Sequence, residues 1–347
     1  MPVPTYSEII RQQRKRLPRE INWWPSYLYH YTDVHNAVGI LEKEWLYDRK
    51  TAEAQHLAKT DAASRNVLEV TGDDIKHCAR LYMRPLTPTQ YYSEGYKPEA
   101  ARHKDYKETD CPVAIFFLFD AVRTLSYPGV CFLEKGGAGR QIERRCSGEE
   151  QFSALNFEKI YHHGPVSDDR SILRYRRTEV LRDDGLPLPG LLRRIVCRSV
   201  AEKETLFSIL QEQCPARYEQ YKDLITAAPA ELGTYLFFRH GIFIRSIKLY
   251  PDYIHIEFNE AKLRFDQNKD RKGAVPVQFT GTLYWKGNNG STLACDTYSG
   301  SLDYKRHTGA NISYRRRLSD HIQLEIRLDG HLVYQNSFDI GSSDILF

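Results

Sequence analysis

The stretch Tyr27-Leu28-Tyr29-His30-Tyr31-Thr32-Asp33 decides how the first half of this chain folds. Its aromatic residues and Thr32 favour a short strand, and the residues that follow favour a helix. Asp33 is the expected N-cap, because its carboxylate can accept from backbone N–H groups that have no partner within the first helical turn. One face of that helix would be apolar: Val34, Ala37, Val38, Ile40 and Leu41. A strand that leads directly into a helix indicates a mixed α/β domain.

Further apolar runs extend this domain along the chain. Three runs are expected to be buried strands: residues 113–119, 130–133 and 192–197. A helix is expected over residues 200–213, and residues 172–181 approach Glu179 as either a helix or a strand. Three segments are expected to be mainly irregular: the polar residues 48–80, which include a short helix, the Pro- and Tyr-rich residues 81–98, and the Gly-rich residues 134–150.

From about residue 233 the pattern changes to short strands. The runs that alternate or are continuously apolar are residues 242–244, 247–250, 253–258, 275–285, 322–328 and 331–338. Turn formers separate them, and Asp329-Gly330 between two alternating runs is a strong hairpin signal. The chain is therefore predicted to be α+β, with a mixed α/β domain over residues 1–215 and a mostly antiparallel β-sandwich or small barrel over residues 233–347.

The composition allows two domains with cores and excludes several classes of protein. The chain has 347 residues, of which 41% are hydrophobic and 27% are charged. Its seven cysteines are scattered without a CxxC pair, so neither a zinc site nor a disulfide scaffold is indicated. No run approaches 18 apolar residues and no signal-peptide h-region is present. We therefore expect a cytoplasmic protein with reduced thiols and no membrane association.

Clusters of basic residues are candidates for contact with a polyanion. The net charge of +4 permits nucleic-acid binding without requiring it. Residues 11–19 contain five cations and residues 170–182 contain five arginines, although such clusters are usually solvated surface. Arg315-Arg316-Arg317 and Lys305-Arg306 in the second domain are similar, and the simpler explanation there is cations that block pairing at a sheet edge.

The familiar catalytic motifs are absent, so candidate residues must be judged one by one. The sequence has no P-loop, no GxGxxG after a strand, no HExxH and no GxSxG elbow. His30, with Tyr31 and Thr32 beside it, can hydrogen-bond a ribose or diphosphate group, but a histidine in a strand is often only structural. Arg65, in Ser64-Arg65-Asn66, can clamp a diphosphate with two parallel hydrogen bonds, or it can simply face solvent.

Glu179 is the candidate for a catalytic carboxylate. It follows three arginines and precedes the apolar Val180 and Leu181. Glycosyl transfer from NAD⁺ requires one fixed carboxylate, which can bind the hydroxyls of the nicotinamide ribose, stabilise an oxocarbenium-like transition state and help to deprotonate the acceptor. The alternative is a glutamate in an ordinary salt-bridge network.

The order and spacing of these motifs resemble those of the DarT family of DNA ADP-ribosyltransferases. The motifs are Tyr29–Asn36, Gly39–Leu41, Ser64–Asn66, Leu81–Pro88, the run at 113–119, the loop at 165–174 and Thr178–Leu181. They span roughly residues 25–210, and because each is short, the specificity lies in their shared order. Three departures bear on the acceptor base more than on the chemistry. Pro88-Thr89-Gln90-Tyr91 stands where the family has Pro-Met-Leu-Tyr, Arg84 is one residue out of register, and a longer insertion precedes the next strand.

The resemblance implies an activity and a set of site residues. Residues 1–215 would form an ADP-ribosyltransferase domain that uses NAD⁺ as donor, needs no metal and modifies a nucleobase in single-stranded DNA. Glu179 would be the catalytic carboxylate, and Arg65 would clamp the diphosphate and assist catalysis. The other NAD⁺ contacts would come from His30, Tyr31, Thr32, Asn36 and Tyr82. Acceptor contacts would come from Tyr91, Asp168, Asp169, Arg170 and Arg174.

The resemblance also implies a partner, and two alternatives remain. Such enzymes act as toxins that a macrodomain-type antitoxin neutralises, in toxin–antitoxin or anti-phage systems. Single-stranded DNA is the expected substrate because base chemistry requires an unstacked base, which the aromatic residues at 82–96 could stack. One alternative is an enzyme that modifies RNA or protein, or only hydrolyses NAD⁺. The other is a non-enzymatic nucleic-acid-binding protein in which His30, Arg65 and Glu179 are structural. Residues 233–347 carry no readable motif.

Overall fold

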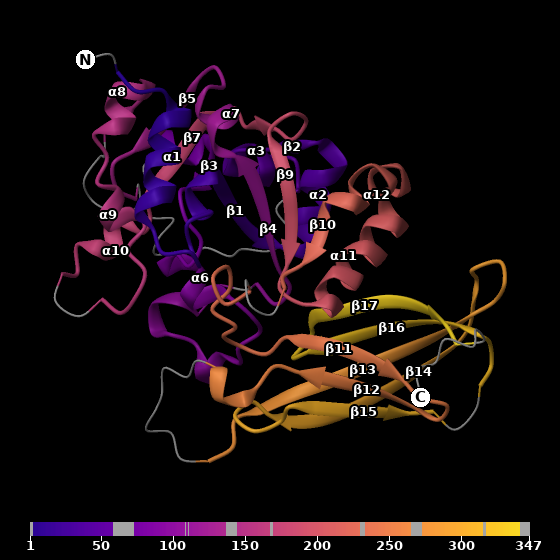
Figure 1. Ribbon diagram of the computed structural model, residues 1–347. Coiled ribbons are helices and arrows are strands. Elements are labelled where there is room, and N and C mark those ends of the chain that lie inside the picture. Colours follow the sequence, from indigo (N-terminus) through magenta and orange to yellow (C-terminus); the bar gives the residue numbers. More distant parts are fainter. Residues whose placement is uncertain are drawn as a thin grey trace.

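The computed structural model describes residues 3–57, 73–107, 109, 111–136, 144–166, 169–229, 233–264, 273–314 and 317–340. Three sets of residues considered above, Ser64-Arg65-Asn66, Asp168 and Arg315-Arg316, lie outside these ranges. The chain forms an N-terminal region of strands and helices, up to residue 229, and a C-terminal region of strands from residue 233 (Figure 1). No helix in the described ranges is long and apolar enough to cross a membrane.

The N-terminal region is built on a mixed sheet of eight strands. Their order is β10-β9-β4-β1-β3-β7-β5-β6, and neighbours are antiparallel except for β9 and β10. The strands are β1 (Tyr27–Asp33), β3 (Cys78–Tyr82), β4 (Ala114–Asp120), β5 (Val130–Leu133), β6 (Arg145–Cys146), β7 (Glu179–Asp183), β9 (Leu192–Cys197) and β10 (Ile225–Ala227). A separate small pair consists of β2 (Trp45–Leu46) and β8 (Leu186–Pro187).

Helices flank this sheet (Figure 1). The α-helices are α1 (Tyr6–Arg16), α2 (Val34–Lys43), α3 (Arg49–Ala54), α5 (Asp73–Lys76), α6 (Pro88–Ser93), α7 (Ala121–Leu125), α8 (Gly148–Ser153), α9 (Phe157–Ile160), α10 (Ile172–Tyr175), α11 (Val200–Gln213) and α12 (Pro215–Tyr221). Short 3-10 helices are η1 (Trp24–Ser26), η2 (Glu99–Ala101), η3 (Lys104–Tyr106), η4 (Lys222–Leu224) and, in the C-terminal region, η5 (Ala261–Leu263).

Strand β1 lies inside the sheet and fixes both the core and the first helix. It pairs with β4 along its whole length, from Tyr27 opposite Asp120 to Asp33 opposite Ala114. The predicted strand and N-cap are confirmed, because Asp33 accepts from the backbone N–H of His35 at 3.0 Å and α2 begins at the next residue. The same carboxylate accepts from the backbone N–H of Val113 at 3.4 Å, so it also ties β1 to the chain that enters β4.

Other predictions for this region are partly confirmed. Strands β5 and β9 and helix α11 have the predicted bounds, and residues 172–181 contain the helix α10 and the beginning of the strand β7. The prediction of irregular structure is wrong in three places. Strand β3 begins within residues 48–80, helix α6 lies within residues 81–98, and residues 134–150 contain β6 and the beginning of α8.

The start of α6 shows why the prediction for residues 81–98 is wrong. Thr87 is the N-cap and its hydroxyl accepts from the backbone N–H of Gln90 at 3.3 Å, while Pro88 occupies the first helical position. The side chain of Gln90 in turn accepts from the backbone N–H of Leu86 at 2.8 Å. A Thr followed by Pro and, three residues on, by Gln is a helix-start signal that the surrounding prolines and tyrosines obscured.

The C-terminal region is a β-sandwich, which is one of the two alternatives predicted. One sheet has the order β11-β12-β15 and the other β14-β13-β16-β17. The strands are β11 (Ile244–Leu249), β12 (Tyr253–Phe258), β13 (Pro276–Lys286), β14 (Thr292–Asp303), β15 (Gly309–Ser313), β16 (His321–Leu328) and β17 (His331–Asp339). Inward side chains of both sheets share one apolar core around Trp285. Gly281 on β13 permits this contact, because a Cβ there would lie 2.3 Å from the Cδ1 atom of Ile312 in the other sheet.

The hairpin signal in this region is confirmed, but two strands were not expected. Asp329 and Gly330 join β16 to β17 with φ values of +46° and +85°, as a tight hairpin turn requires. The unexpected strands are β14 and β15. Strand β14 lies at a sheet edge with most of its side chains outside the core, so its sequence has little apolar alternation.

Backbone and side-chain contacts join the two regions. Tyr96 and Ile242 exchange backbone hydrogen bonds of 2.9 and 2.7 Å. Beside them Gly241, with a φ of +70°, approaches the chain so closely that a Cβ on it would lie 2.6 Å from the carbonyl carbon of Gly95. Further along, the hydroxyl of Tyr334 on β17 donates to Glu204 on α11 at 2.7 Å.

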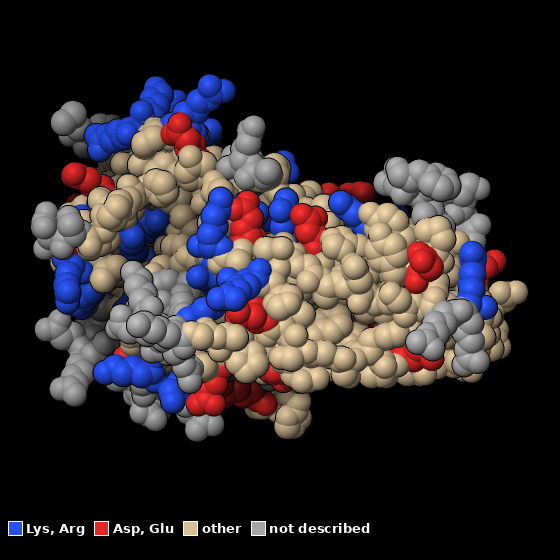
Figure 2. All heavy atoms as spheres, turned by 90° about the horizontal axis from the view of Figure 1, so that it is seen from below, with Lys and Arg blue, Asp and Glu red and all other residues tan. Residues whose placement is uncertain are grey.

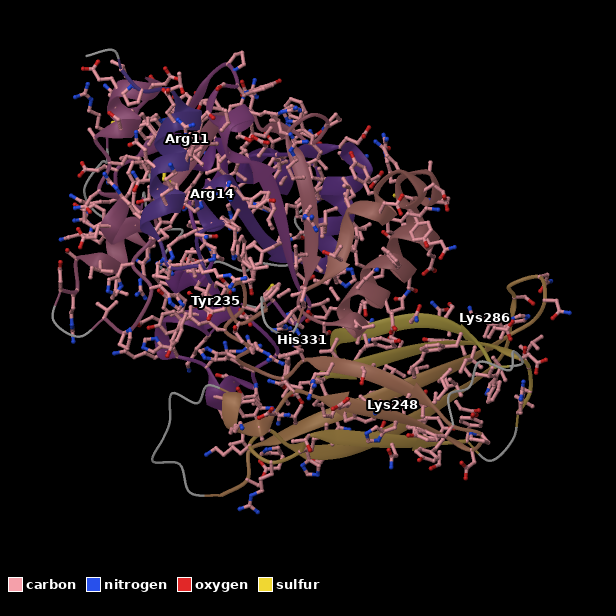
Figure 3. All side chains as sticks on the ribbon, viewed as in Figure 1. Arg11, Arg14, Tyr235, Lys248, Lys286 and His331 are labelled. Carbon is pink, nitrogen blue, oxygen red and sulfur yellow. The ribbon has the colours of Figure 1, made fainter. Side chains whose placement is uncertain are left out.

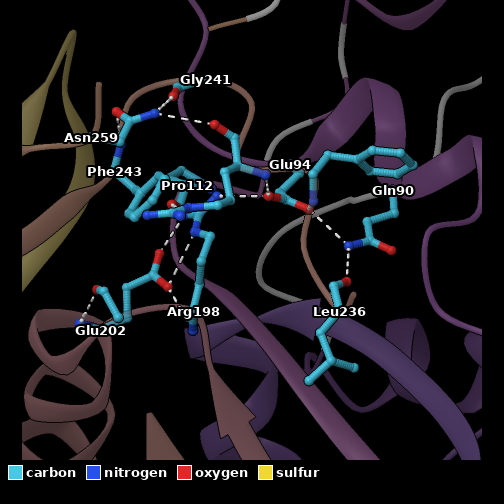
Figure 4. A network of polar contacts seen from close by, with 12 residues as sticks. Gln90, Glu94, Pro112, Arg198, Glu202, Leu236, Gly241, Phe243 and Asn259 are labelled. Atoms are coloured by element: carbon cyan, nitrogen blue, oxygen red, sulfur yellow. Dashed lines mark hydrogen bonds and ion pairs between the residues drawn. The ribbon is translucent and has the colours of Figure 1, made fainter. Parts of the chain in front are cut away.

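A buried ionic network lies at the same junction (Figure 4). Arg198, directly after β9, forms ion pairs with Glu202 and Glu94, and none of the three side chains is more than 1% exposed. Glu202 accepts from Arg198 Nε at 3.3 Å, and Glu94 accepts from Arg198 Nη1 at 3.4 Å. Glu94 also accepts from the backbone N–H groups of Phe238 and Arg239, at 3.0 and 2.6 Å. One buried carboxylate thus fixes the segment that connects the two regions.

Candidate active site

Glu179 and Arg80 form an ion pair on adjacent strands of the N-terminal sheet. Glu179 is the first residue of β7 and lies opposite Tyr82, the last residue of β3. Arg80 donates to Glu179 Oε1 from Nε at 3.1 Å and from Nη2 at 2.5 Å. The Glu179 side chain is 2% exposed, so its carboxylate is both desolvated and held in a fixed orientation. Such a group is ready to act electrostatically without reorganising.

His30 binds the backbone of the same arginine. Strand β1 pairs with β3 at Tyr29 and Tyr82, and beyond that pair His30 Nδ1 lies 3.2 Å from the carbonyl oxygen of Arg80. A carbonyl oxygen only accepts, so Nδ1 carries the hydrogen and Nε2 is left as the acceptor of the ring. Burial lowers the pKa of His30 to about 4, which keeps the imidazole neutral near pH 7. Arg80 therefore links His30 and Glu179, through its carbonyl and its guanidinium respectively.

Arg80, which holds this arrangement together, was not among the residues predicted from the sequence. Burial acts to lower the pKa of Arg80, but the adjacent Glu179 carboxylate raises it above the ordinary arginine value, so the side chain stays charged. A usable signal was present, because Arg80 lies between the buried Ala79 and Leu81 on a strand. A charged residue that interrupts a buried strand usually has a specific partner.

The other predicted NAD⁺ contacts fall into two groups. Tyr82 lies beside the ion pair, and burial, followed by the Glu179 carboxylate, raises its pKa. Tyr31 points to the opposite face of β1 from His30, and its ring centroid lies 5.3 Å from that of Phe116. Burial, followed by the nearby Cys111 and Glu94, raises the pKa of Tyr31 well above the usual value. Thr32 is buried in β1, and Asn36 is half-buried in the first turn of α2. The structure thus groups His30, Tyr82 and Glu179 around Arg80, with Thr32 and Asn36 further along the chain.

The predicted acceptor residues lie on the segment that precedes Glu179. Asp169 accepts from Lys159 Nζ at 2.8 Å and from the backbone N–H of Ser171 at 2.9 Å, and these bonds lower its pKa to about 2. Arg170 and Arg174 are exposed. The segment therefore presents charged side chains to solvent at the approach to the carboxylate.

Tyr91, the remaining predicted acceptor residue, lies at the junction between the two regions. Its ring packs edge-on against the rings of Phe238 and His240, at centroid distances of 5.1 and 4.9 Å. The side chain thus lies with the C-terminal segment that Glu94 fixes. Among the described residues, no group of three or more His, Cys, Asp or Glu side chains could hold a metal ion.

The region that contains these side chains matches a known family. The family model described as "ssDNA thymidine ADP-ribosyltransferase, DarT" matches residues 29–225, more than half of the chain, and this range includes His30, Arg80 and Glu179. The protein is therefore an NAD⁺-dependent ADP-ribosyltransferase, with NAD⁺ as the donor of ADP-ribose. More specifically, the chain belongs to the DarT family, whose members act on single-stranded DNA.

Solved structures of the family are similar at low sequence identity. The DarT of Thermus sp. 2.9 in complex with ADP-ribosylated single-stranded DNA is 16% identical with a TM-score of 0.44, over 60% of this chain and 96% of that chain. The same protein in complex with NAD⁺ is 15% identical with a TM-score of 0.41, over 59% and 96%. The DarTG of Thermosipho africanus in complex with ADP-ribose is 15% identical with a TM-score of 0.43, over 64% and 53%. No curated protein sequence matches the chain.

Proposed function

We propose that the protein transfers ADP-ribose from NAD⁺ to thymidine in single-stranded DNA, and that it acts as the toxin of a toxin–antitoxin pair. The observation that carries the enzymatic part is the buried Glu179–Arg80 ion pair with His30 bound to the same arginine. These side chains lie within the residues that the family model matches, and the description of that family supports thymidine as the acceptor.

The side chains around Arg80 fit the ribose end of the dinucleotide. NAD⁺ supplies an ADP-ribosyl group that is bonded to a cationic leaving group. His30 Nε2 can accept a hydrogen bond from a ribose hydroxyl, because Nδ1 is held on the carbonyl of Arg80. The Glu179 carboxylate can accept from a second hydroxyl, and its charge would stabilise the positive charge that develops on the ribose. The Tyr82 ring, next to Glu179, offers an aromatic surface for the nicotinamide.

The acceptor base must also lose a proton during the transfer, and Glu179 is placed to accept it. A thymine base in DNA has a single ring N–H, at N3. When the bond from N3 to the ribose carbon forms, the bond to nicotinamide breaks and the N3 proton must leave. Glu179 is the buried carboxylate at this place in the sheet, so we assign to it both the electrostatic role and the acceptance of that proton.

A transfer assay with labelled NAD⁺ tests the enzymatic proposal. Purified protein would be incubated with single-stranded DNA that contains or lacks thymidine, with duplex DNA, with RNA and without acceptor. We expect label only on thymidine-containing single strands, and none when the thymine carries a methyl group on N3. Glu179→Gln should lower the rate by about 10²- to 10³-fold or more, because it removes the charge and keeps the shape.

The matched control is Glu158→Gln, since Glu158 is an exposed carboxylate on α9. It should keep the wild-type rate and unfolding temperature. Glu179→Gln leaves Arg80 without its counterion, so it should unfold at a lower temperature, and circular dichroism should show that it is still folded at the assay temperature. Label on RNA or protein would show that single-stranded DNA is not the substrate, and the proposed transfer of ADP-ribose from NAD⁺ would stand. Intact NAD⁺ with every acceptor would overturn the proposal and favour a non-enzymatic nucleic-acid-binding protein.

The toxin part of the proposal has its own test. Expression of the wild-type chain in bacteria should stop growth, while expression of Glu179→Gln should not. A macrodomain-type hydrolase, expressed together with the wild type, should restore growth by removing the modification from DNA. If expression of Glu179→Gln still stopped growth, the proposal that the enzymatic activity causes the toxicity would be contradicted.

A further inference from the structure

A pocket of about 530 Å³ lies where the two regions meet. The N-terminal region contributes Arg84, Arg176 and His163, and the connecting segment contributes Phe237, Phe238 and Arg239. The match to the family ends at residue 225, so the second set of residues lies outside the part that defines the family. Seen from below, Lys and Arg side chains gather in the left half of the view, whereas the right half shows mostly uncharged residues (Figure 2).

Two arginines in this pocket, Arg84 and Arg176, have only neutral hydrogen-bond partners among the residues that the structure describes. Arg84 is 1% exposed, and its Nε and Nη1 atoms donate to the carbonyl oxygens of Pro85, Ile160 and His162. Arg176 donates from Nη2 to Gly164 O at 2.5 Å and contacts the ring of His162 at 2.8 Å. Its Nε atom is buried with no hydrogen-bond partner in the described part of the chain.

The positive charges of the two guanidinium groups also repel one another. Burial, and next the charge of Arg176, lower the pKa of Arg84 to about 9, while burial lowers the pKa of Arg176. Two close cations in a partly dry site, with carbonyl partners and an unsatisfied donor, form a place where an anion would be stabilised. Phosphate is the anion whose geometry arginine matches best in nucleic-acid recognition.

Arg239 adds a third cation from the C-terminal side. Its backbone is held in the left-handed region, with φ of +64°, by Glu94, which accepts from its N–H, and by Asn259, which donates to its carbonyl oxygen at 3.1 Å. This strained conformation is maintained by buried partners and directs the half-buried side chain to the pocket. The acidic side chain that lines the pocket, Glu260, is already paired with Lys262 at 2.8 Å.

Aromatic rings complete the pocket. Phe238 is half-buried, and Glu94 fixes its backbone N–H at 3.0 Å. Phe237 is buried beneath it in the aromatic cluster around Phe116. Arginines beside a partly exposed aromatic ring are the combination that binds one nucleotide of a single strand, with phosphate on the arginines and base on the accessible part of the ring. The volume lies within the range of about 300–1,000 Å³ typical of small-ligand sites.

The pocket is also close to the candidate catalytic carboxylate. Arg84 follows Tyr82 by two residues and Arg176 precedes Glu179 by three, and between them the backbone N–H of Met83 donates to Thr178 at 3.1 Å. Two residues of chain span at most about 7 Å. The pocket therefore begins just beyond the strand ends that present Glu179. Figure 3 shows Tyr235, which precedes the aromatic pair, at this junction, whereas Arg11 and Arg14 lie on α1, away from it.

We propose that this pocket is a nucleotide-binding subsite for the substrate strand, in which Arg84, Arg176 and Arg239 bind a phosphate and Phe238 stacks the base next to the one that is modified. The proposal rests on the single-stranded DNA substrate proposed above. It also assigns a role to the C-terminal region, which supplies Phe238 and Arg239; Glu94 holds the backbone N–H groups of both, and Asn259 holds the carbonyl oxygen of Arg239.

Binding of short oligonucleotides tests the subsite. In the Glu179→Gln background, where transfer is slow, unlabelled strands would compete with a longer fluorescein-labelled strand. The competitors would be a trinucleotide with a central thymidine and the same strand extended by one nucleotide at either end. We expect one of the two extensions to strengthen binding by about tenfold when the pocket is intact. With Arg239→Asn the gain should fall below about twofold, because Asn keeps the left-handed backbone and removes the cation.

Two further variants test the stacking role of Phe238 and control for the loss of an arginine elsewhere. Phe238→Leu should reduce the same gain without changing the charge of the pocket. Arg317→Asn removes an exposed arginine that is paired with Asp320 at the far end of the sandwich, and it should keep the full gain. An equal gain in the intact protein, in Arg239→Asn and in Phe238→Leu would overturn the subsite.

The failure of the subsite can be told apart from failure of the proposed function. If the wild type transfers ADP-ribose to DNA but the gain does not depend on Arg239 or Phe238, the subsite is wrong and the function stands. If no DNA is modified and the gain still depends on both residues, the function is wrong and the nucleotide site stands.

Discussion

The N-terminal region buries charge, whereas the sandwich buries almost only apolar side chains. Arg80, Glu179, Arg198 and Glu202 are buried or nearly so within or beside the N-terminal sheet. In the described strands of the sandwich, β11 to β17, every charged side chain is at least partly exposed. An ion taken out of water costs several kcal/mol unless a partner compensates it. These buried ion pairs lie at the candidate site and at the junction of the two regions, and there a single substitution should have the largest effect.

The largest effect on stability is expected at the junction. Arg198→Met leaves Glu94 and Glu202 buried without their cation, which should lower the free energy of unfolding by about 3–5 kcal/mol. The counterpart in the sandwich is Arg327, which is 42% exposed and pairs with Glu325 on β16 at 2.6 Å. Arg327→Met should cost less than about 1 kcal/mol. Urea unfolding of both variants measures the difference, and similar losses in the two would break the comparison.

A smaller effect is expected on the rate of ADP-ribose transfer when the partner of Glu179 changes. Arg80→Lys keeps the charge but replaces two hydrogen bonds to one carboxylate oxygen by a point charge, so the carboxylate loses its fixed orientation. We expect kcat to fall by about 10²-fold, with NAD⁺ still bound. The cross-strand pair of Arg245 and Glu257 in the sandwich is the control, and Arg245→Lys should keep the wild-type kcat. An unchanged kcat in Arg80→Lys would make the ion pair structural.

The same contrast explains what could be predicted from the sequence. The strand with His30 and the cap at Asp33 depend on neighbours along the chain, and their residue types were sufficient. The partners Arg80 and Glu179 are separated by 99 positions, and Arg198 and Glu94 by 104, so only the folded sheet brings them together. Glu179 was identified through the family motif, whereas no motif pointed to Arg80. The sandwich was recognised from apolar alternation, and its exposed edge strand β14, which lacks that alternation, was missed.

The smallest of these effects depends on pH and concerns His30. Its pKa in the folded protein is about 4, against about 6.5 in an unfolded chain. Between these values the unfolded state binds more protons than the folded state, so acidification through this window destabilises the fold and alkalinisation restores it. From pH 7 to pH 5 the loss due to this one histidine should be about 2 kcal/mol of the free energy of unfolding.

The variant His30→Gln isolates this contribution, because a glutamine amide can still donate to the carbonyl of Arg80 but does not titrate. The loss of stability between pH 7 and pH 5, measured by urea unfolding, should be about 2 kcal/mol smaller than in the wild type. His255→Gln on the sandwich, where the ring is exposed and contacts Asn311 at 2.7 Å, should keep the wild-type loss. A wild-type loss in His30→Gln would mean that His30 already takes up a proton in the folded protein. Burial would then not keep the imidazole neutral as the pH falls, and His30 could serve as a neutral acceptor for ribose only above about pH 6.5.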